Sequence, residues 1–239
     1  MDLPLPTSTD RASPGTVERL WAQYLQSHSD WEPAEGPLLV VGAQPQAQVL
    51  GAGGLIRAWA GMGRPVTVMS VTDSDDMDSD RKSLALRRHA ELKEALRVLC
   101  ASQVSIVRLG VPGGGRSVDW QNRLRNAILS LLEPKLTLIA PYESDGHPAQ
   151  DLVGKVCVEV AASRKLPLAR YPLRIWRRTD PAAFDGARWG KFYLDQEGSR
   201  AKAHALQCFA QQRDAVSPDS GDAGAAANRL SQCYEAYLL

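Results

Sequence analysis

The chain has 239 residues, which is long enough for one α/β domain with a full hydrophobic core. Its hydrophobic content of 44% and charged content of 23% are typical of globular proteins, and its net charge of +1 gives no electrostatic reason to expect nucleic acid or an anionic membrane as a partner. No apolar run approaches the ~20 residues of a membrane-spanning helix, and the N-terminal residues lack the basic head and apolar run of a secretory signal.

Hydrophobic periodicity and turn residues divide the chain into alternating strands and helices. Residues 1–12 are expected to form a flexible arm, residues 13–239 one α/β domain, and the small residues of 217–228 a linker within it. In chain order, the predicted elements are a helix over 13–28, a strand over 38–41, a helix over 51–62, a strand over 65–71, a helix over 81–100, a strand over 104–109, a helix over 120–132, a strand over 136–140, a helix over 152–163, a strand within 168–177, a helix over 198–212 and a short helix over 229–239.

This alternation predicts a Rossmann-like, three-layer αβα fold with a mostly parallel sheet. In such sheets, ligands bind beyond the carboxyl ends of the strands, near the point where the strand order reverses. The loops 42–50, 72–80 and 141–151 are expected to meet there.

The loop after the first predicted strand carries a distinctive motif. Residues 38–54 read LLVVGAQPQAQVLGAGG. This segment resembles the first motif of the PIG-L/LmbE-like zinc N-deacetylases, A-H-P-D-D-E followed by two residues and GAGG. Pro45 and the GAGG are in register, whereas Gln44 stands at the family's His, Gln46 and Ala47 at its two Asp, and Gln48 at its Glu.

A second segment, PYESDGHPAQD at 141–151, resembles the family pattern P-x-x-x-D-G-H-P-D-H. Asp145, Gly146, His147 and Pro148 match, and Gln150 replaces the final His. Three weaker similarities complete the resemblance, which spans about residues 37–213: Asp73 after the second strand, Arg88 with Glu91 as R-x-x-E, and the stretch from Lys202 to Gln211.

The resemblance implies a catalytic zinc held by two His and one Asp, with a nearby carboxylate as general base. In this chain the three ligand positions are Gln44, Ala47 and Gln150, and the base position is Gln46. A neutral amide oxygen is a poor zinc ligand, alanine offers no donor atom, and glutamine accepts no proton at neutral pH. We therefore expect no zinc and no other cofactor at these positions.

The sequence also offers residues for other kinds of site. An oxygen-rich site for a hard cation could draw on the acidic residues of 72–80 together with Glu143, Asp145, His147 and Asp151, but a solvated acidic loop before a helix is the simpler interpretation. His147 either stabilises a charged intermediate, as the resemblance implies, or is a relic that hydrogen-bonds locally. The glycines do not follow G-x-G-x-x-G, and no Ser or Cys stands in a nucleophile motif.

The sequence thus predicts a deacetylase-like protein that has lost the zinc site and binds an N-acetylated sugar or glycoconjugate without hydrolysing it. The expected ligand-binding residues are Gln44, Asp73, Arg88, Asp145 and Gln150, with His147 as a residual catalytic group. One alternative is an active amide hydrolase that uses displaced metal ligands or His147; another is a structural partner of another enzyme. Four widely spaced cysteines without a CxxC favour free thiols and the cytoplasm.

Overall fold

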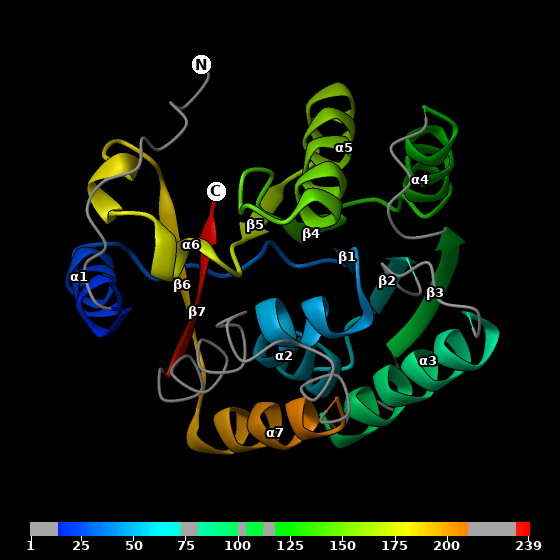
Figure 1. Cartoon of the computed structure of the whole chain (residues 1–239), viewed down its shortest axis with the longest axis horizontal. Helices are drawn as coiled ribbons and strands as arrows, with labels where there is room; N and C mark the ends of the chain where they lie inside the picture. The colour runs from blue at the N-terminus through cyan, green and yellow to red at the C-terminus, as the bar shows by residue number, and fades with distance from the viewer. Residues whose placement is uncertain (1–13, 73–80, 100–103, 112–117, 210–232) are drawn as a thin grey trace.

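The computed structural model describes residues 14–72, 81–99, 104–111, 118–209 and 233–239. A seven-stranded sheet lies between two layers of helices (Figure 1). The predicted three-layer α/β fold is therefore confirmed. The predicted arm, residues 73–80 of the acidic loop and the whole of the predicted linker lie outside the described residues. None of the helices in the described ranges is long and apolar enough to cross a membrane.

The sheet has the strand order β3-β2-β1-β4-β5-β7-β6. The first five strands are parallel, and β6 and β7 join them in antiparallel pairs. β1 and β4 are buried along their whole length, as the apolar run of 38–41 predicts for a central parallel strand. The bounds of the strands are β1 Leu38–Gly42, β2 Val66–Thr72, β3 Val104–Val111, β4 Thr137–Pro141, β5 Leu168–Tyr171, β6 Trp189–Tyr193 and β7 Tyr234–Leu238.

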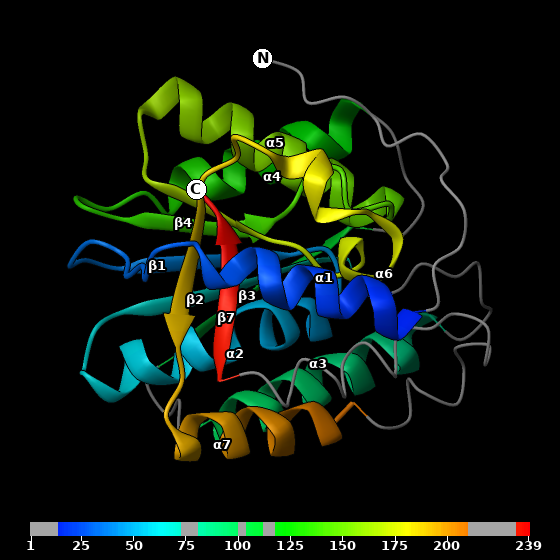
Figure 2. The ribbon, with the colours of Figure 1, turned by 90° about the vertical axis from the view of Figure 1, so that its left-hand side faces the viewer.

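Helices cover both faces of the sheet (Figure 2). On one face, α2 (Pro45–Gly61), α3 (Arg81–Val98) and α7 (Gln196–Gln207) enclose a core that includes Trp59 and Leu92. On the other face, α4 (Val118–Ser130) and α5 (Pro148–Arg164) enclose a second core.

A third cluster of apolar side chains lies at the β6 end of the sheet. It joins α1 (Pro14–Gln26), α6 (Ile175–Arg178) and the 3-10 helix η1 (Pro181–Phe184). The Trp21 ring contacts the Trp176, Phe184 and Trp189 rings at centroid distances of 4.9 to 5.3 Å. These contacts fix α6 beside the carboxyl end of β5.

Helix α2 differs from its predicted form. It begins at Pro45 rather than at Gly51, and the helical geometry breaks at Ala52, where φ is −142° and ψ is 20°. Two of the GAGG glycines are required by close packing: a Cβ on Gly51 would lie 2.2 Å from the Tyr171 ring, and a Cβ on Gly54 would lie 2.1 Å from Leu194. The glycines that predicted a helix start therefore belong to the interior of a broken helix.

The prediction of a short helix at 229–239 is wrong over the described part of that segment. Tyr234–Leu238 is the strand β7, and it pairs along its length with β6, which the sequence analysis did not predict. In β7, Glu235 and Tyr237 are buried and face α2, where Glu235 accepts hydrogen bonds from the Gly54 and Leu55 N–H groups. The period of two that places them there is a strand pattern.

Candidate functional site

By the general rule for open α/β sheets, the strand order predicts a ligand crevice between β1 and β4. The chain runs from β1 outward to β2 and β3, and then crosses to the other side of β1 to form β4. The connections that leave β1 and β4 therefore diverge at the carboxyl edge of the sheet. This reversal is the usual place for a ligand site in an open α/β sheet.

The first motif lies in the connection after β1. Gln44 is the N-cap residue of α2, in an extended conformation, and its side chain makes no capping hydrogen bond. Its carbonyl oxygen accepts the Ala47 N–H at 3.0 Å, which forms the first turn. The Gln44 and Gln46 side chains are half-buried, and Ala47 is buried. Pro45, at the first helical position, suits this start because its backbone needs no hydrogen-bond acceptor there.

The second motif meets the first through Gln150. The Gln150 side chain is buried in the first turn of α5, and its Oε1 accepts the backbone N–H of Ala43 at 3.1 Å. Ala43 directly precedes Gln44, so this bond brings the DGHP segment and the GAQPQA segment to the same place. Predictions of ligand contact by Gln44, Gln46 and Gln150 stay predictions, and the Gln150–Ala43 bond shows only that the two motifs meet.

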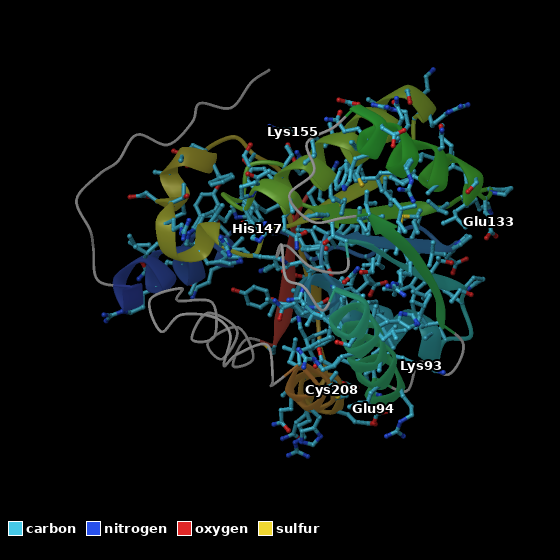
Figure 3. All side chains as sticks on the ribbon, turned by 45° about the vertical axis from the view of Figure 1, so that its right-hand side comes forward. Lys93, Glu94, Glu133, His147, Lys155 and Cys208 are labelled. Carbon is cyan, nitrogen blue, oxygen red and sulfur yellow. The ribbon has the colours of Figure 1, made fainter. Side chains whose placement is uncertain are left out.

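His147 is the N-cap residue of α5, and Figure 3 places it at the start of that helix, with Lys155 further along. Its Nδ1 accepts the Gln150 N–H at 3.5 Å, a long bond that requires an unprotonated Nδ1. In the neutral ring, Nε2 then carries the proton. His147 therefore makes the local hydrogen bond that its interpretation as a relic implies.

The turn before His147 is organised by Asp151. Its Oδ1 accepts the backbone N–H groups of Asp145, Gly146 and His147 at 2.9 to 3.3 Å. Burial raises the pKa of Asp151 above its ordinary value, although these three hydrogen bonds act in the opposite direction. Gly146 has a φ of +82°, a conformation that favours glycine.

Asp145 holds the next connection in place. Its Oδ1 accepts the N–H groups of Leu173, Arg174 and Ile175 at 2.7 to 3.1 Å, and the side chain is buried. This oxygen therefore anchors the segment between β5 and α6. The predicted ligand contact of Asp145 stays a prediction, and the structure adds a structural role that the sequence pattern did not indicate.

Two further side chains at the crevice were not predicted as site residues. Gln48 is fully buried; its Nε2 donates to the Met69 carbonyl at 2.7 Å, and its Oε1 has no hydrogen-bond partner among the described residues. Thr72 Oγ1 donates to the Ala43 carbonyl at 2.8 Å and ties β2 to the first motif. In the sequence, the position of Gln48 is signalled by its alignment with the Glu of the family motif.

Two predicted site residues remain, Arg88 and Asp73. Arg88 is half-buried on α3, and its predicted ligand contact stays a prediction. Asp73 lies outside the described residues.

The donor set at this crevice does not fit the zinc implied by the resemblance. Two of the three ligand positions offer only amide oxygens, and the Gln150 oxygen already accepts a backbone N–H. The third position is alanine. Within the described ranges, no group of three His, Cys, Asp or Glu side chains is placed to hold a metal ion.

Comparisons with known proteins agree with this geometry at the level of the fold. No family model matches the chain, and no curated protein matches it. Among solved structures, the A40926 pseudoaglycone deacetylase Dbv21 has a TM-score of 0.61 at 16% identity, over 84% of this chain and 95% of that chain. The N,N'-diacetylchitobiose deacetylase from Pyrococcus horikoshii has a TM-score of 0.57 at 17% identity, over 84% of this chain and 82% of that chain.

The fold is thus that of the PIG-L/LmbE-type deacetylases, which confirms the resemblance at this level. A third similar structure shows that the fold alone does not determine the reaction. The 4-carboxy-2-hydroxymuconate hydratase GalB from Pseudomonas putida KT2440 has a TM-score of 0.52 at 15% identity, over 85% of this chain and 94% of that chain. Function has to be argued from the side chains at the crevice.

Proposed function

We propose that this chain is a PIG-L/LmbE-type domain that binds an N-acetylated sugar or glycoconjugate and does not hydrolyse it. The observation that carries the proposal is the Gln150 side chain. It stands at a position where the family has a zinc ligand, and it instead hydrogen-bonds the Ala43 N–H at 3.1 Å. The two motifs are therefore joined by a hydrogen bond within the chain, and their junction requires no metal.

The polarity of the crevice supports a sugar ligand. Each glutamine amide offers both a donor and an acceptor, which suits hydroxyl and acetamido groups. Gln44 and Gln46 are half-buried rather than fully buried, which suits side chains that contact a ligand at the surface. The similar solved structures include deacetylases whose names give diacetylchitobiose and a pseudoaglycone as substrates.

The same side chains argue against hydrolysis. The family reaction needs a metal-activated water and a carboxylate base, which supply most of the rate enhancement. Gln46 accepts no proton at neutral pH. His147 is the one family-matched catalytic group that remains, and its Nδ1 already accepts the Gln150 N–H.

Metal content, turnover and binding test the proposal together. We expect substoichiometric zinc by elemental analysis, no deacetylation of N,N'-diacetylchitobiose above background, and calorimetric binding of that sugar. Chelator-sensitive turnover would support the active hydrolase instead. Absence of sugar binding together with absence of turnover would favour the structural partner.

Restoring the family residues tests the residue assignment. The variant Gln44→His, Gln46→Asp, Ala47→Asp and Gln150→His should bind zinc with at least micromolar affinity, worth about 8 kcal/mol. The matched control is the same variant with Gln150 retained, which lacks one ligand and should bind zinc much more weakly. A folded quadruple variant that binds zinc no better than this control would contradict the assignment.

A further inference from the structure

Gln48 joins the first turn of α2, which carries the first motif, to the carboxyl ends of two strands. Its side chain is fully buried, and its Nε2 donates to the Met69 carbonyl of β2 at 2.7 Å. The same Nε2 lies 3.5 Å from the Gly42 carbonyl of β1, which makes a longer second contact. A single amide group therefore ties the start of α2 to both β1 and β2.

The end of β1 leaves room for this amide. A Cβ on Gly42 would lie 2.7 Å from Gln48 Cδ and 2.9 Å from its Nε2. Any residue larger than glycine would therefore push the amide away from the strand. The glycine at the end of β1 and the buried amide of Gln48 belong to one arrangement.

Both contacts of Gln48 require a hydrogen-bond donor. A carbonyl oxygen only accepts, so the reverse orientation of the amide would place Oε1 against another acceptor. The related family has Glu at this position, and both oxygens of an ionised carboxylate are acceptors. Only a protonated carboxyl could make the bond to Met69, because an O–H group donates over the same distance of 2.7 Å.

The groups around position 48 decide whether such a proton would be retained. The Tyr171 hydroxyl of β5 would lie 3.0 Å from a Cβ on Gly42, and it donates to the Val41 carbonyl at 2.7 Å. Burial raises the pKa of Tyr171 well above its ordinary value, so this group is uncharged at neutral pH. The elements that pack against α2 also carry charged or titratable residues that are buried or half-buried, among them Arg88, His89 and Glu91 on α3, Lys202 on α7 and Glu235 on β7, of which the last two form an ion pair.

We propose that Gln48 is a positioning residue of the candidate site, and that this chain requires a neutral hydrogen-bond donor where the related family has Glu. Gln44 and Gln46, the proposed sugar contacts, belong to the same turn, because the Gln44 carbonyl accepts the Ala47 N–H. The bond from Gln48 to Met69 sets the position of that turn above the strand ends. This inference rests on the proposed function, since the buried Gln48 acts on a ligand only through Gln44 and Gln46.

Urea unfolding of Gln48→Glu from pH 5 to pH 8 tests the need for a donor. The introduced carboxyl should stay protonated in the folded protein, because burial and the two carbonyls raise its pKa, whereas it ionises near about pH 4.3 in the unfolded chain. The variant should therefore resemble the parent most closely at pH 5. Above that pH its folding equilibrium constant should fall by up to about tenfold per pH unit relative to the parent, until the pH passes the raised pKa.

Two control variants isolate this effect. Gln48→Met keeps a similar volume without a donor or a charge, so its loss of stability relative to the parent should not change with pH. Gln46→Glu adds a carboxylate to a half-buried position in the first turn of the helix, which favours the ionised form, and it should lose no stability as the pH rises. A pH-independent difference between Gln48→Glu and the parent would overturn the donor requirement. A Gln48→Glu variant that stays unfolded at pH 5 while Gln48→Met folds would overturn it as well.

Calorimetry with N,N'-diacetylchitobiose tests the positioning role. We expect Gln48→Met to bind this sugar about three- to tenfold more weakly than the parent, the range that one hydrogen bond supports. Gln48→Glu should bind like the parent at pH 5 and as weakly as Gln48→Met at pH 8. The matched control is Leu124→Ala in the core beneath α4, which lowers stability away from this turn and should leave sugar binding unchanged.

The outcomes separate this inference from the proposed function. Sugar binding by Gln48→Met that equals that of the parent, or an equal loss in Leu124→Ala, would overturn the positioning role and leave the proposed function standing. If the parent itself binds no sugar, the proposed function fails and the positioning role fails with it. The pH series then still decides whether position 48 needs a donor.

Discussion

The substitution Glu235→Gln should strongly destabilise the protein. Glu235 is a buried carboxylate whose Oε1 accepts the Gly54 N–H at 2.7 Å and Lys202 Nζ at 2.5 Å. Its Oε2 accepts the Leu55 N–H at 3.0 Å and the Tyr237 hydroxyl at 2.8 Å. The two backbone donors lie just after the break in α2, where a new helix start would otherwise leave N–H groups without acceptors. Glu235 therefore acts as the cap of the second half of α2.

The expected magnitude follows from what glutamine cannot replace. The substitution keeps the shape of the side chain, but it turns one acceptor oxygen into an NH₂ group that faces donors. It also leaves the Lys202 ammonium, whose side chain is 8% exposed, without its counter-charge. Removal of one partner from a buried ion pair destabilises a protein by about 3–5 kcal/mol. That is a large share of the about 5–15 kcal/mol by which domains are stable.

Lys202→Met should have a smaller effect than Glu235→Gln. The carboxylate then keeps three donors, from Gly54, Leu55 and Tyr237. Hydrogen bonds to a charged group contribute about 1.5–3 kcal/mol each, so these three bonds retain much of the contribution of the Glu235 carboxylate to stability. The double variant should be no less stable than Glu235→Gln alone, because it removes both charges.

Urea unfolding at pH 7, with an unchanged m value, measures these differences. The matched control is Glu94→Gln, which breaks the exposed pair between Glu94 and Arg97 on α3 and should leave the midpoint unchanged. A loss of less than about 1 kcal/mol for Glu235→Gln would place this network in the range of surface ion pairs and refute the reasoning. Strict additivity of the two single substitutions would refute the coupling between them.

Three further predictions concern other parts of the fold. Gly51→Ala should destabilise the protein by about 1–3 kcal/mol in urea unfolding, because its Cβ would lie 2.2 Å from the Tyr171 ring. The control is Gly61→Ala in the same helix, whose Cβ would have nothing within 4 Å and which should be neutral or slightly stabilising. Equal effects of the two substitutions would contradict this explanation. Burial raises the pKa of Asp151 above its ordinary value of 3.8, so its contribution to stability is fully present below that pH and is lost as the pH rises through the raised value. Relative to Asp151→Asn, the parent protein should therefore lose stability over this window, and parallel stability curves would count against the raised pKa. Burial also raises the pKa of the Cys157 thiol, so this thiol should react slowly in the native protein. Cys157→Ser should therefore leave the number of fast-reacting thiols unchanged in the native protein and reduce it by one in denaturant. A lower number in the native variant would show that Cys157 is accessible.

The parallel part of the fold could be predicted from the sequence because its signals are local. The apolar run at 38–41 and the turn residues around it identify a buried strand without reference to the rest of the chain. The crevice between β1 and β4 follows from the alternation of strands and helices, and the Gln150–Ala43 bond lies where the two motifs were expected to meet.

The antiparallel end of the sheet could not be predicted in the same way. β6 and β7 are distant in sequence, and each forms a strand because the other supplies its hydrogen bonds. The N–H groups that follow the break at Ala52 find their acceptor in Glu235, a residue far along the chain. The anchoring role of Asp145 likewise depends on the Leu173–Ile175 backbone, which only the folded chain brings close. Such non-local contacts leave little trace in a window of neighbouring residues.

The position of β7 also sets the order in which the protein can be completed during synthesis. β7 lies between β5 and β6 in the sheet, although it follows both in the chain. Until residues 234–238 have left the ribosome, β6 lacks the strand with which it pairs in the described part of the chain, and the second half of α2 lacks its cap. A nascent chain that ends before Tyr234 therefore exposes the edges of β5 and β6, and unpaired edges of this kind favour aggregation. The sheet is therefore complete only after β7, one of its inner strands, has been translated.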